Sequence, residues 1–457
     1  MGKTLKLAEF IESISYADLP EEVIACAKRC LFDYFGCAIF ATQTNMGQII
    51  NAVCQEGGSG VSTILSDMKG SYEASFAALA NGTCAHGFEL DDVHLPSVSH
   101  PGAVVISAAL ALGEERGVDG KRFIEAVVAG YEAMARIGST VGSAHVDHGF
   151  HPTASHGTFG AAAAAAKILN LNKEQIANAF GIAGSLASGI MQFSISGTMV
   201  KRIHAGKAAQ QGVIIAKLAE RGFTGPNDVL EGGYGYCTVF RGLLNKEEID
   251  FDAIDRDLSV RYKILDTMIK PSPACGCLHA VVEGLVNIRQ DADFRLSDVK
   301  EIRVLGHHNL AEMHNDYAPD TILGAQYSLP FTAAMSLVHD IENAGNYLDE
   351  SILQDEEVLH TAKLIVPVFD EEIEQYFPEH FSAAVEVVMN DGKVYREVII
   401  DPKGTAENPF SDHDVKRKYS KLVSSVLSKE AAEALAGNIE RITSLSNIKD
   451  LFWGINQ

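Results

Sequence analysis

The sequence predicts a mainly α protein, in which both chain ends build one large multihelical domain and a smaller α+β domain is inserted between them. Three observations support this prediction. Apolar residues recur at helical spacing through most of the first 240 residues, strand-like and helical patterns mix after about residue 258, and helical spacing returns from Ser411 onward. We place the helical domain at residues 1–265 and 401–457 and the α+β domain at residues 266–400.

The helices of the first half are predicted from their spacing and their ends. Asp18 and Glu21 fit a capping box, and Asn172 and Gln175 fit a second one. Residues 160–166 are one Gly and six Ala, a composition that lets helix axes approach closely. The predicted helices cover residues 21–35, 101–112, 121–137, 157–169, 173–186 and 205–221.

The α+β domain is predicted from three strand-like runs. Val299–Leu305 alternates as a strand does, and two β-rich runs within His380–Ile400 flank Asn390-Asp391-Gly392, a strong hairpin signal. Helical patterns occur over residues 278–288, 326–339 and 351–359 in this region, and over residues 415–422 and 429–435 beyond it.

Composition excludes several classes of protein. The 457 residues are 47% hydrophobic and 21% charged, which is typical of a globular protein with a large core. The net charge of −23 makes nucleic acid an unfavourable partner. No segment has the roughly 18 apolar residues that cross a bilayer, and no signal peptide is recognised, so no membrane association is expected. Cys26 and Cys30 fall in an apolar helical pattern that predicts buried thiols, and we expect a cytoplasmic, reduced protein.

Histidines gather in four groups with other titratable residues. Each group is set among Gly and Pro at the end of an expected element, which favours a functional site over coincidence. The groups are His86, His94 and His100 with Glu89, Asp91 and Asp92; His145, His148, His151 and His156; Lys201, Arg202, His204 and Lys207; and Lys270, Cys275, Cys277 and His279.

Three kinds of chemistry compete for these groups. The spacings include no HExxH, no CxxC pair and no His-x-His, so no metal site is predicted. No GxSxG occurs, and Cys275 has no nucleophile signature around it. The glycine-rich residues 57–60 and 232–235 lack the order of a phosphate loop and are predicted to be turns. General acid–base chemistry on an anionic carbon acid uses the most features, because Lys201 and Arg202 can hold carboxylates while histidines and a carboxylate move protons.

These groups resemble the MmgE/PrpD family, which includes 2-methylcitrate dehydratase, cis-aconitate decarboxylase and iminodisuccinate epimerase. The matching stretches are HGFELDDVHLPSVSHPGA (86–103), GFHPTASHGTFGAAAAAAKIL (149–169), GTMVKRIHAGKAAQQG (197–212), IKPSPACGCLHA (269–280), AQYSLPF (325–331) and NPFS (408–411). They follow the family's order along nearly the whole chain. The resemblance implies a lid-like role for the α+β domain, a site in the cleft between domains, a homodimer, and no metal or organic cofactor.

The resemblance also implies site residues. The expected catalytic residues are Glu89 (where the family usually has Asp), Asp91, His100, His151 and Lys201. The expected substrate-binding residues are Asp92, Arg202, His204, Lys270, Cys275, His279, Tyr327 and Ser328. In the family's decarboxylases a histidine follows the lysine at the Lys270 position by five residues. Here Cys275 occupies that place, and the ELDDVH stretch looks closer to the epimerase-like members than to the dehydratase.

Three functions are therefore carried forward. The first is a lyase, either a dehydratase or a decarboxylase, that moves a proton next to a carboxylate of a small di- or tricarboxylate. His151 or Lys201 would act as base and His100 as acid, while Lys201, Arg202 and Lys270 would stabilise the developing negative charge. The second is an epimerase of an iminodisuccinate-like dicarboxylate with the same site. The third is a catalytically inactive binding protein on the same fold.

Overall fold

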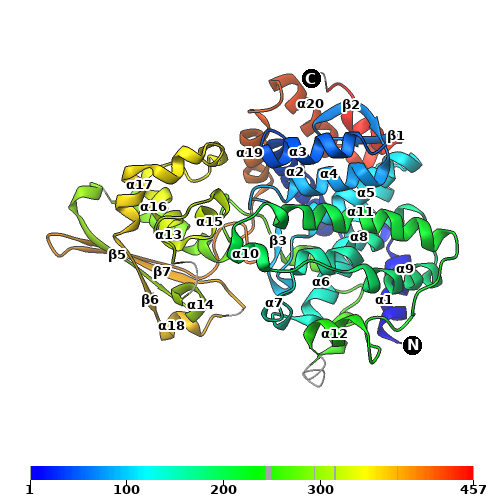
Figure 1. Ribbon diagram of the computed structural model, residues 1–457, viewed down its shortest axis with the longest axis horizontal. Helices are drawn as coiled ribbons and strands as arrows, with labels where there is room; N and C mark the ends of the chain where they lie inside the picture. The colour runs from blue at the N-terminus through cyan, green and yellow to red at the C-terminus, as the bar shows by residue number, and fades with distance from the viewer. Residues whose placement is uncertain (1, 243–248, 293, 313–314, 378, 456–457) are drawn as a thin grey trace. The chain divides into compact units, whose positions relative to one another are not determined.

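The computed structural model describes residues 2–242, 249–292, 294–312, 315–377 and 379–455, and these are mainly helical, which confirms the predicted fold class (Figure 1). The chain divides into two compact units. One unit joins both chain ends, Met1–Met268 and Ser411–Gln457, and the other is Ile269–Phe410.

The unit that contains both chain ends is built from helices and two short two-stranded sheets, β1-β2 and β3-β4. Its helices are α1 (Lys3–Ser13), α2 (Glu21–Ala41), α3 (Asn45–Gln55), α4 (Ala74–Ala85), α5 (Pro101–Arg116), α6 (Gly120–Val141), α7 (Ala144–Asp147), α8 (Pro152–Ile168), α9 (Lys173–Leu186), α10 (Gln192–Ser196), α11 (Val200–Glu220), α12 (Tyr236–Arg241), α19 (Asp412–Val423) and α20 (Lys429–Glu440). Its strands are β1 (Ser59–Ile64), β2 (Asp67–Tyr72), β3 (Val93–His94) and β4 (Thr267–Met268).

Helix α8 forms the centre of this unit. All 17 of its residues are buried, and α5, α6, α9 and α11 pack around it (Figure 1). A helix whose surface is apolar on every side is stable only when other helices surround it. The alanines and glycines predicted to allow close packing therefore form the core of the helical unit.

Helices α4 and α11 cross so closely that only glycine fits at the crossing. A Cβ atom on Gly206 would lie 2.2 Å from the carbonyl oxygen of Leu79 and from Oγ1 of Thr83. A Cβ atom on Gly82 would lie 2.8 Å from the Cα atom of Gly206. These two glycines bring the C-terminal end of α4 next to the first turns of α11.

Two capping boxes were predicted in this unit, and the structure confirms one of them. The capping box of Asn172 and Gln175 is confirmed at the start of α9. The capping box of Asp18 and Glu21 is wrong, because Asp18 ends a 3₁₀ turn and Pro20 is the N-cap residue of α2. Most of the first 240 residues are helical as predicted, and the β1–β2 hairpin is an exception that was not predicted.

The β1–β2 hairpin is attached to α5 through a buried carboxylate. Thr63 donates to Glu114 from its backbone nitrogen (2.8 Å) and from Oγ1 (2.6 Å). In β1 the apolar Val61 is exposed beside Ser59 and Gly60, so the hairpin lacks the apolar alternation by which a half-buried strand is recognised.

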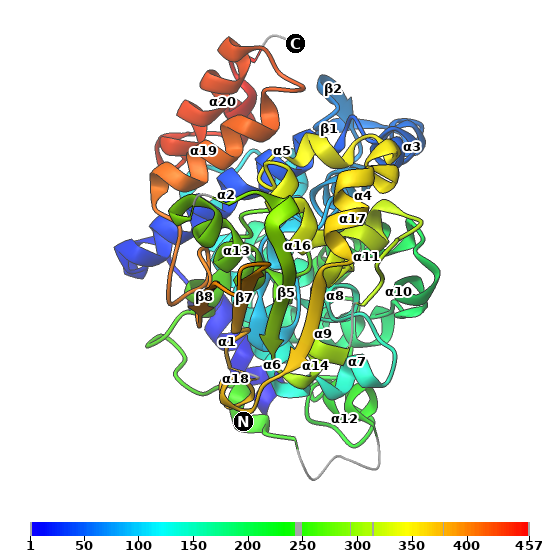
Figure 2. The same cartoon turned by 90° about the vertical axis from the view of Figure 1, so that its left-hand side faces the viewer.

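The second unit contains a four-stranded sheet and short helices. The strands are β5 (Val299–Gly306), β6 (Ile365–Phe369), β7 (Ala383–Met389) and β8 (Val394–Ile399), and the helices are α13 (His279–Asp291), α14 (His308–Glu312), α15 (Ile322–Tyr327), α16 (Leu329–Val338), α17 (Glu356–Ala362) and α18 (Glu371–Glu374). The strand order is β6-β5-β7-β8, with β5 and β6 parallel and the other pairs antiparallel (Figure 2). The predicted strand at 299–305 and the hairpin at 390–392 are confirmed, whereas β6 was not predicted.

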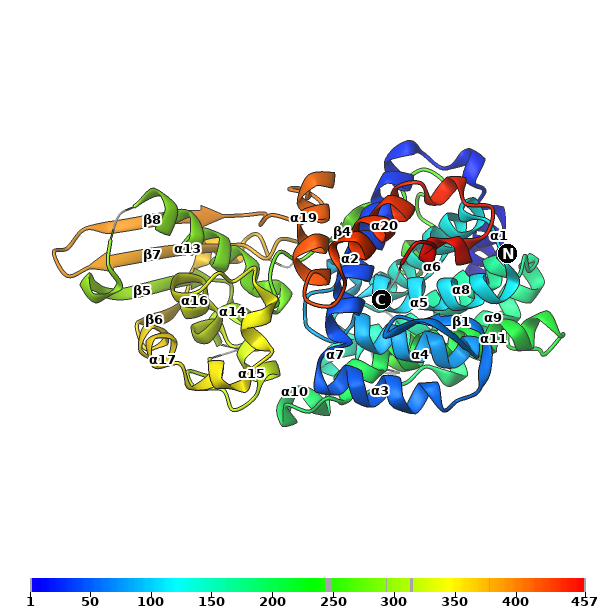
Figure 3. The same ribbon diagram turned by 90° about the horizontal axis from the view of Figure 1, so that it is seen from above.

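One face of this sheet is covered by α13 and α16 (Figure 3). The apolar side chains of Ile302, Val385 and Val387 pack there against both helices. The opposite face carries charged residues, with Glu386 within 3.6 Å of both Arg303 and Arg396. This division between an apolar face and a charged face is typical of an antiparallel sheet with one side in water.

Composition and spacing predicted buried thiols and no membrane-spanning segment. Cys26 and Cys30 are buried free thiols, as predicted from their helical spacing. Within the described part of the chain, every helix is too short or too polar to cross a bilayer.

We expect Gly206→Ala to lower the free energy of unfolding by about 1–3 kcal/mol, because the added methyl group would overlap α4. Gly437→Ala in α20 is the matched control. A Cβ atom there meets nothing within 4 Å, so the higher helix propensity of Ala should raise stability by up to about 1 kcal/mol. Chemical denaturation of both variants checks this, and equal effects at the two positions would contradict the close crossing.

Candidate active site

The loop that follows α4 carries a carboxylate shared by two imidazoles. His86, the C-cap residue of α4, donates from Nδ1 to Oδ2 of Asp91 at 2.8 Å. His100 Nδ1 lies 3.3 Å from the same oxygen. All three side chains are buried, and His100 is the most accessible of them at 9% exposure. Asp91 therefore orients both rings.

A second carboxylate in this loop pairs with two cations. Lys201 Nζ and Arg202 Nη1 both donate to Oε1 of Glu89, and all three residues are buried. Arg202 Nη1 also lies 3.3 Å from the carbonyl oxygen of His86. The loop after α4 is thus attached to the first turn of α11.

His151 connects these two groups. Its ring centroid lies 5.8 Å from that of His86, and its Nδ1 lies 2.9 Å from Nδ1 of His204. Phe193 packs edge-on against His151 at 5.1 Å, and Lys201 Nζ lies 5.9 Å from the centre of the Phe193 ring. The expected residues Glu89, Asp91, His100, His151, Lys201, Arg202 and His204 therefore form one buried cluster in the helical unit.

The N-termini of three long helices converge on this cluster. His100 is the N-cap residue of α5 and His151 that of α8, and each is followed by a proline at the first helical position, where a missing N–H costs nothing. Lys201 is the second residue of α11. Helix N-termini carry partial positive charge and unpaired N–H groups, which favour anions. These N-termini add partial positive charge to a cluster in which Lys201 and Arg202 already offset the charges of Glu89 and Asp91.

The protonation states suit acid–base work. Burial lowers the pKa of His86 to about 3, although Asp91 opposes the shift. Burial also lowers the pKa of His151 well below its usual value, and His86 and Lys201 lower it further. The pKa of His204 falls to about 4 through burial and the nearby Lys207 and Lys201. These imidazoles are therefore neutral near pH 7, with a nitrogen lone pair on each ring.

Asp91 and Asp92 are neighbours with opposite behaviour. Burial raises the pKa of Asp91, but the contacts with His86 and His100 outweigh burial and hold it well below the usual value. Burial and the nearby Asp33 raise the pKa of Asp92 well above its usual value. Its oxygens accept hydrogen bonds from Tyr131 Oη (2.6 Å) and the Gly102 nitrogen (2.9 Å). Asp92 therefore belongs to a network behind the loop, whereas Asp91 faces the imidazoles.

His86 is the member of the cluster that was not among the expected site residues. The residue lies in the first histidine group, and its distance of five residues from Asp91 at the end of a helix is the one signal in the sequence. Its Nδ1 bond to Asp91 leaves the Nε2 atom buried, with no hydrogen-bond partner in the described part of the chain. An oriented imidazole with an unused nitrogen is the arrangement of a general base.

The same residues could hold a cation. His86, Asp91 and His100 each offer a ligand atom, and these atoms lie within 4.8 Å of one another. The neighbouring Lys201 opposes such an ion, since its charge already lowers the pKa of His86. The donor set is compatible with a metal but is equally accounted for by the hydrogen bond of His86 to Asp91 and the 3.3 Å contact of His100 with the same oxygen.

The second histidine group divides in the structure. His151 joins the cluster, whereas His145 and His156 lie in a separate aromatic region. There His145 Nε2 lies 2.6 Å from Oγ of Ser155, and Tyr236 Oη lies 2.7 Å from Nδ1 of His156.

The other expected residues belong to the unit formed by residues 269–410. Lys270 and His279 are buried, with Nδ1 of His279 3.4 Å from Oγ of Ser272. The Sγ atoms of Cys275 and Cys277 are 3.5 Å apart. Tyr327 ends α15, and Ser328 caps α16 by accepting a hydrogen bond from the Phe331 nitrogen at 3.0 Å.

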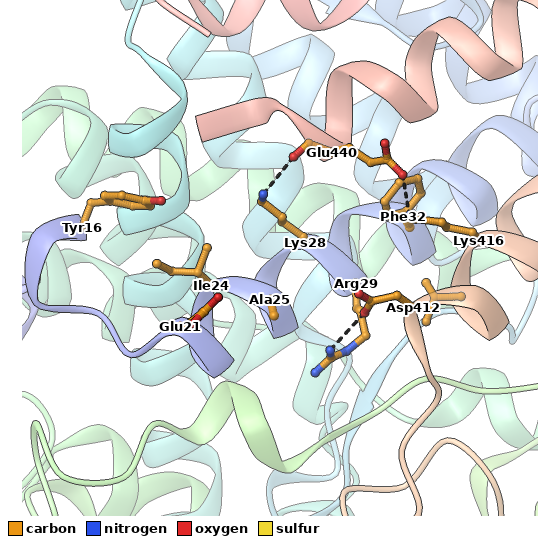
Figure 4. Close-up of a pocket in the computed structure, with 11 residues that line it drawn as sticks. Tyr16, Glu21, Ile24, Ala25, Lys28, Arg29, Phe32, Asp412, Lys416 and Glu440 are labelled. Atoms are coloured by element: carbon orange, nitrogen blue, oxygen red, sulfur yellow. Dashed lines mark hydrogen bonds and ion pairs between the residues drawn. The ribbon is translucent and has the colours of Figure 1, made fainter. Parts of the chain in front are cut away.

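A separate hollow of about 380 Å³ lies between α2, α19 and α20 (Figure 4). Its cations are already paired: Lys28 donates to the carbonyl oxygen of Glu440 at 2.8 Å, and Arg29 lies 3.3 Å from Asp412. The lining contains no histidine. The hollow therefore offers fewer groups for proton transfer than the histidine cluster does.

Comparison with known proteins agrees with the resemblance. The MmgE/PrpD N-terminal domain matches residues 5–249, and the MmgE/PrpD C-terminal domain matches residues 272–441. The cis-aconitate decarboxylase-like protein oryM of Aspergillus oryzae is 26% identical, with 98% of this chain and 96% of the relative covered. The cis-aconitate decarboxylases of Aspergillus terreus and Homo sapiens are 25% and 24% identical, with 98% of this chain and 96% and 92% of the relatives covered. The chain therefore belongs to the MmgE/PrpD family.

Proposed function

We propose that the protein is a lyase that transfers a proton at a carbon next to a carboxylate of a small di- or tricarboxylate, without a cofactor. One observation carries this proposal. Three helix N-termini and two cations surround neutral imidazoles, so the site combines attraction for an anion with groups that accept protons. The relatives named cis-aconitate decarboxylase make an aconitate-type tricarboxylate the first substrate to test.

In the proposed reaction, Lys201 and Arg202 bind substrate carboxylates and stabilise the negative charge that develops on them. Their pairing with Glu89 keeps both cations in place before substrate arrives. A proton moves between the substrate carbon and a neutral imidazole, for which His86 (held by Asp91) and His151 are the candidates. His100, the more exposed imidazole beside Asp91, passes protons to and from the substrate.

Decarboxylation and dehydration differ in the bond that breaks. In decarboxylation, the carbon–carbon bond to one carboxylate breaks, carbon dioxide leaves, and the electron pair that remains on the substrate takes up a proton. In dehydration, the base removes a proton, the carbon–oxygen bond breaks, and the leaving hydroxide takes a proton to become water. Lys270, Cys275, His279, Tyr327 and Ser328 remain proposed substrate contacts, and a homodimer remains the proposed assembly.

An epimerase remains the second candidate. His86 and His151 are two neutral imidazoles with ring centroids 5.8 Å apart, and two bases are what removal of a proton from one face and return to the other require. The carbanion would then be reprotonated instead of expelling a group.

We expect the purified protein to contain no stoichiometric zinc, iron or manganese, and its activity to survive a chelator. The spacing of the ligating residues is not that of a known metal motif, and Lys201 opposes a cation beside His86. Elemental analysis and assays with and without the chelator check this. A metal that is lost together with activity, and whose binding is abolished in His86→Ala, would contradict the acid–base proposal.

We expect Lys201→Met to lower kcat about 100-fold, a loss of about 2.7 kcal/mol of transition-state stabilisation. The fold should be retained, because Arg202 still pairs with Glu89 and methionine keeps the length of the apolar stem. Lys217→Met, in the same helix and paired with Glu115 at 2.7 Å, is the control and should keep its kcat. An unchanged kcat with a higher KM would make Lys201 a binding residue for the ground state only.

We expect deuterium from heavy water to enter one carbon of the product in decarboxylation or epimerisation, and one carbon of the substrate where its deprotonation is reversible, because every proposed reaction includes proton transfer there. A panel of citrate-, aconitate- and aspartate-like acids followed by NMR checks this. Loss of a carboxylate identifies decarboxylation, a new alkene identifies dehydration, and inversion without an alkene identifies the epimerase. His151→Ala should suppress the exchange, whereas the surface variant His413→Ala should not.

The panel also tests the inactive binding protein. If no acid exchanges or turns over while several raise the melting temperature, the lyase proposal is wrong and the binding function gains support.

A further inference from the structure

A buried ion pair contacts the backbone of the loop after α4, and none of the proposed catalytic steps uses it. Asp33 of α2 and Lys418 of α19 are 2% and 8% exposed, and Lys418 Nζ donates to Oδ1 of Asp33. The two residues are 385 positions apart in the sequence, and α2 and α19 pack side by side (Figure 3). Burial of two charges is costly unless both find further partners.

Those further partners are backbone groups of the loop after α4. Lys418 Nζ donates to the carbonyl oxygen of Leu90 at 2.7 Å. Oδ2 of Asp33 accepts a hydrogen bond from the backbone nitrogen of Asp92 at 3.0 Å. The ion pair therefore binds the residue before Asp91 and the residue after it, and fixes the backbone on both sides of the carboxylate that orients the two imidazoles.

The loop needs such support because its backbone is strained. Glu89 has φ of 55°, in the left-handed region, where a residue with a side chain loses roughly 1–2 kcal/mol. Strain of this kind persists only where surrounding contacts enforce it. The bond from Lys418 to the Leu90 carbonyl acts on the residue directly after Glu89.

Asp92 extends the same support to α5 and α6. Its side chain accepts from Tyr131 of α6 and from the Gly102 nitrogen of α5. A Cβ atom on Gly102 would lie 2.7 Å from Oδ1 of Asp92 and 2.9 Å from the Tyr131 hydroxyl. The glycine of the HPG sequence therefore has a physical role, since any side chain there would push Asp92 out of the network.

We propose that Asp33 and Lys418 are positioning residues, which hold residues 89–92 so that Glu89 reaches Lys201 and Arg202 while Asp91 faces His86 and His100. The C-terminal segment of the chain thereby contributes to the site without touching the substrate. The effect on turnover rests on the proposed function, whereas the effect on the loop does not.

The test compares the double variant Asp33→Asn/Lys418→Met with the single variants and with Lys167→Met. The double variant removes both charges, so no unpaired charge stays buried and the fold is retained even if the single variants unfold. Lys167 is a matched control: it is a buried lysine in the same unit that donates to the backbone carbonyls of Ile11 and Glu12 at 3.2 and 2.7 Å.

Peptide-level hydrogen exchange over residues 86–100 is the first measurement. We expect exchange in this segment to rise at least tenfold in the double variant and to stay at the wild-type rate in Lys167→Met. Equal exchange in the double variant and the wild type would overturn the proposal, and this holds whether or not any acid is turned over.

Steady-state kinetics on the acid that the wild type converts are the second measurement. We expect kcat to fall at least tenfold in the double variant with a smaller change in KM, and to stay at the wild-type value in Lys167→Met. A folded double variant with faster loop exchange and an unchanged kcat would reduce the ion pair to a role in stability and overturn its role in positioning.

Discussion

The close crossing of α4 and α11 is the constraint on which the candidate site depends. Helix α4 ends at His86 and α11 begins directly before Lys201, and Gly82 and Gly206 let their backbones meet between these points. At this separation Glu89 reaches Lys201 and Arg202. A wider crossing would break the buried ion pairs of Glu89 with both cations, which is destabilising. The ion pairs of the site therefore depend on the small residues that let α4 and α11 pack closely.

The site separates the binding of charge from the transfer of protons. Glu89 pairs with the two cations, whereas Asp91 pairs with two imidazoles. Burial and the positive surroundings keep His86 and His151 unprotonated, so the groups that can act as bases differ from those that attract an anion. In a protein with net charge −23, the two cations and the three helix N-termini are the features of this site that favour a carboxylate.

The joining of both chain ends in one helical unit has a consequence at this site. Helix α19 packs against α2, and through Asp33 and Lys418 these two helices contact the backbone around Asp91. Tyr131 and Gly102 add contacts from α6 and α5. Helices α2, α5, α6 and α19, from both ends of the chain, thus support one loop of a few residues, including the left-handed Glu89.

Local features of the sequence determined much of the fold. Helical spacing located α2, α8 and α9, the pair Asn172 and Gln175 marked a helix start, and Asn390-Asp391-Gly392 marked a hairpin, because these signals act over a few residues. Family resemblance then singled out Glu89, His100, His151 and Lys201, which the tertiary structure brings into one cluster. The β1–β2 hairpin and β6 escaped prediction because their strands are short and lack apolar alternation.

Only the tertiary structure decided which buried polar groups become partners. It paired His86 with Asp91, separated His145 and His156 from His151, turned Asp92 away from its neighbour Asp91, and joined Asp33 to Lys418. No local pattern predicts such partners, because a sequence records backbone preference and apolar spacing over short distances. Hydrogen bonds between buried side chains depend instead on how helices from distant parts of the chain pack together.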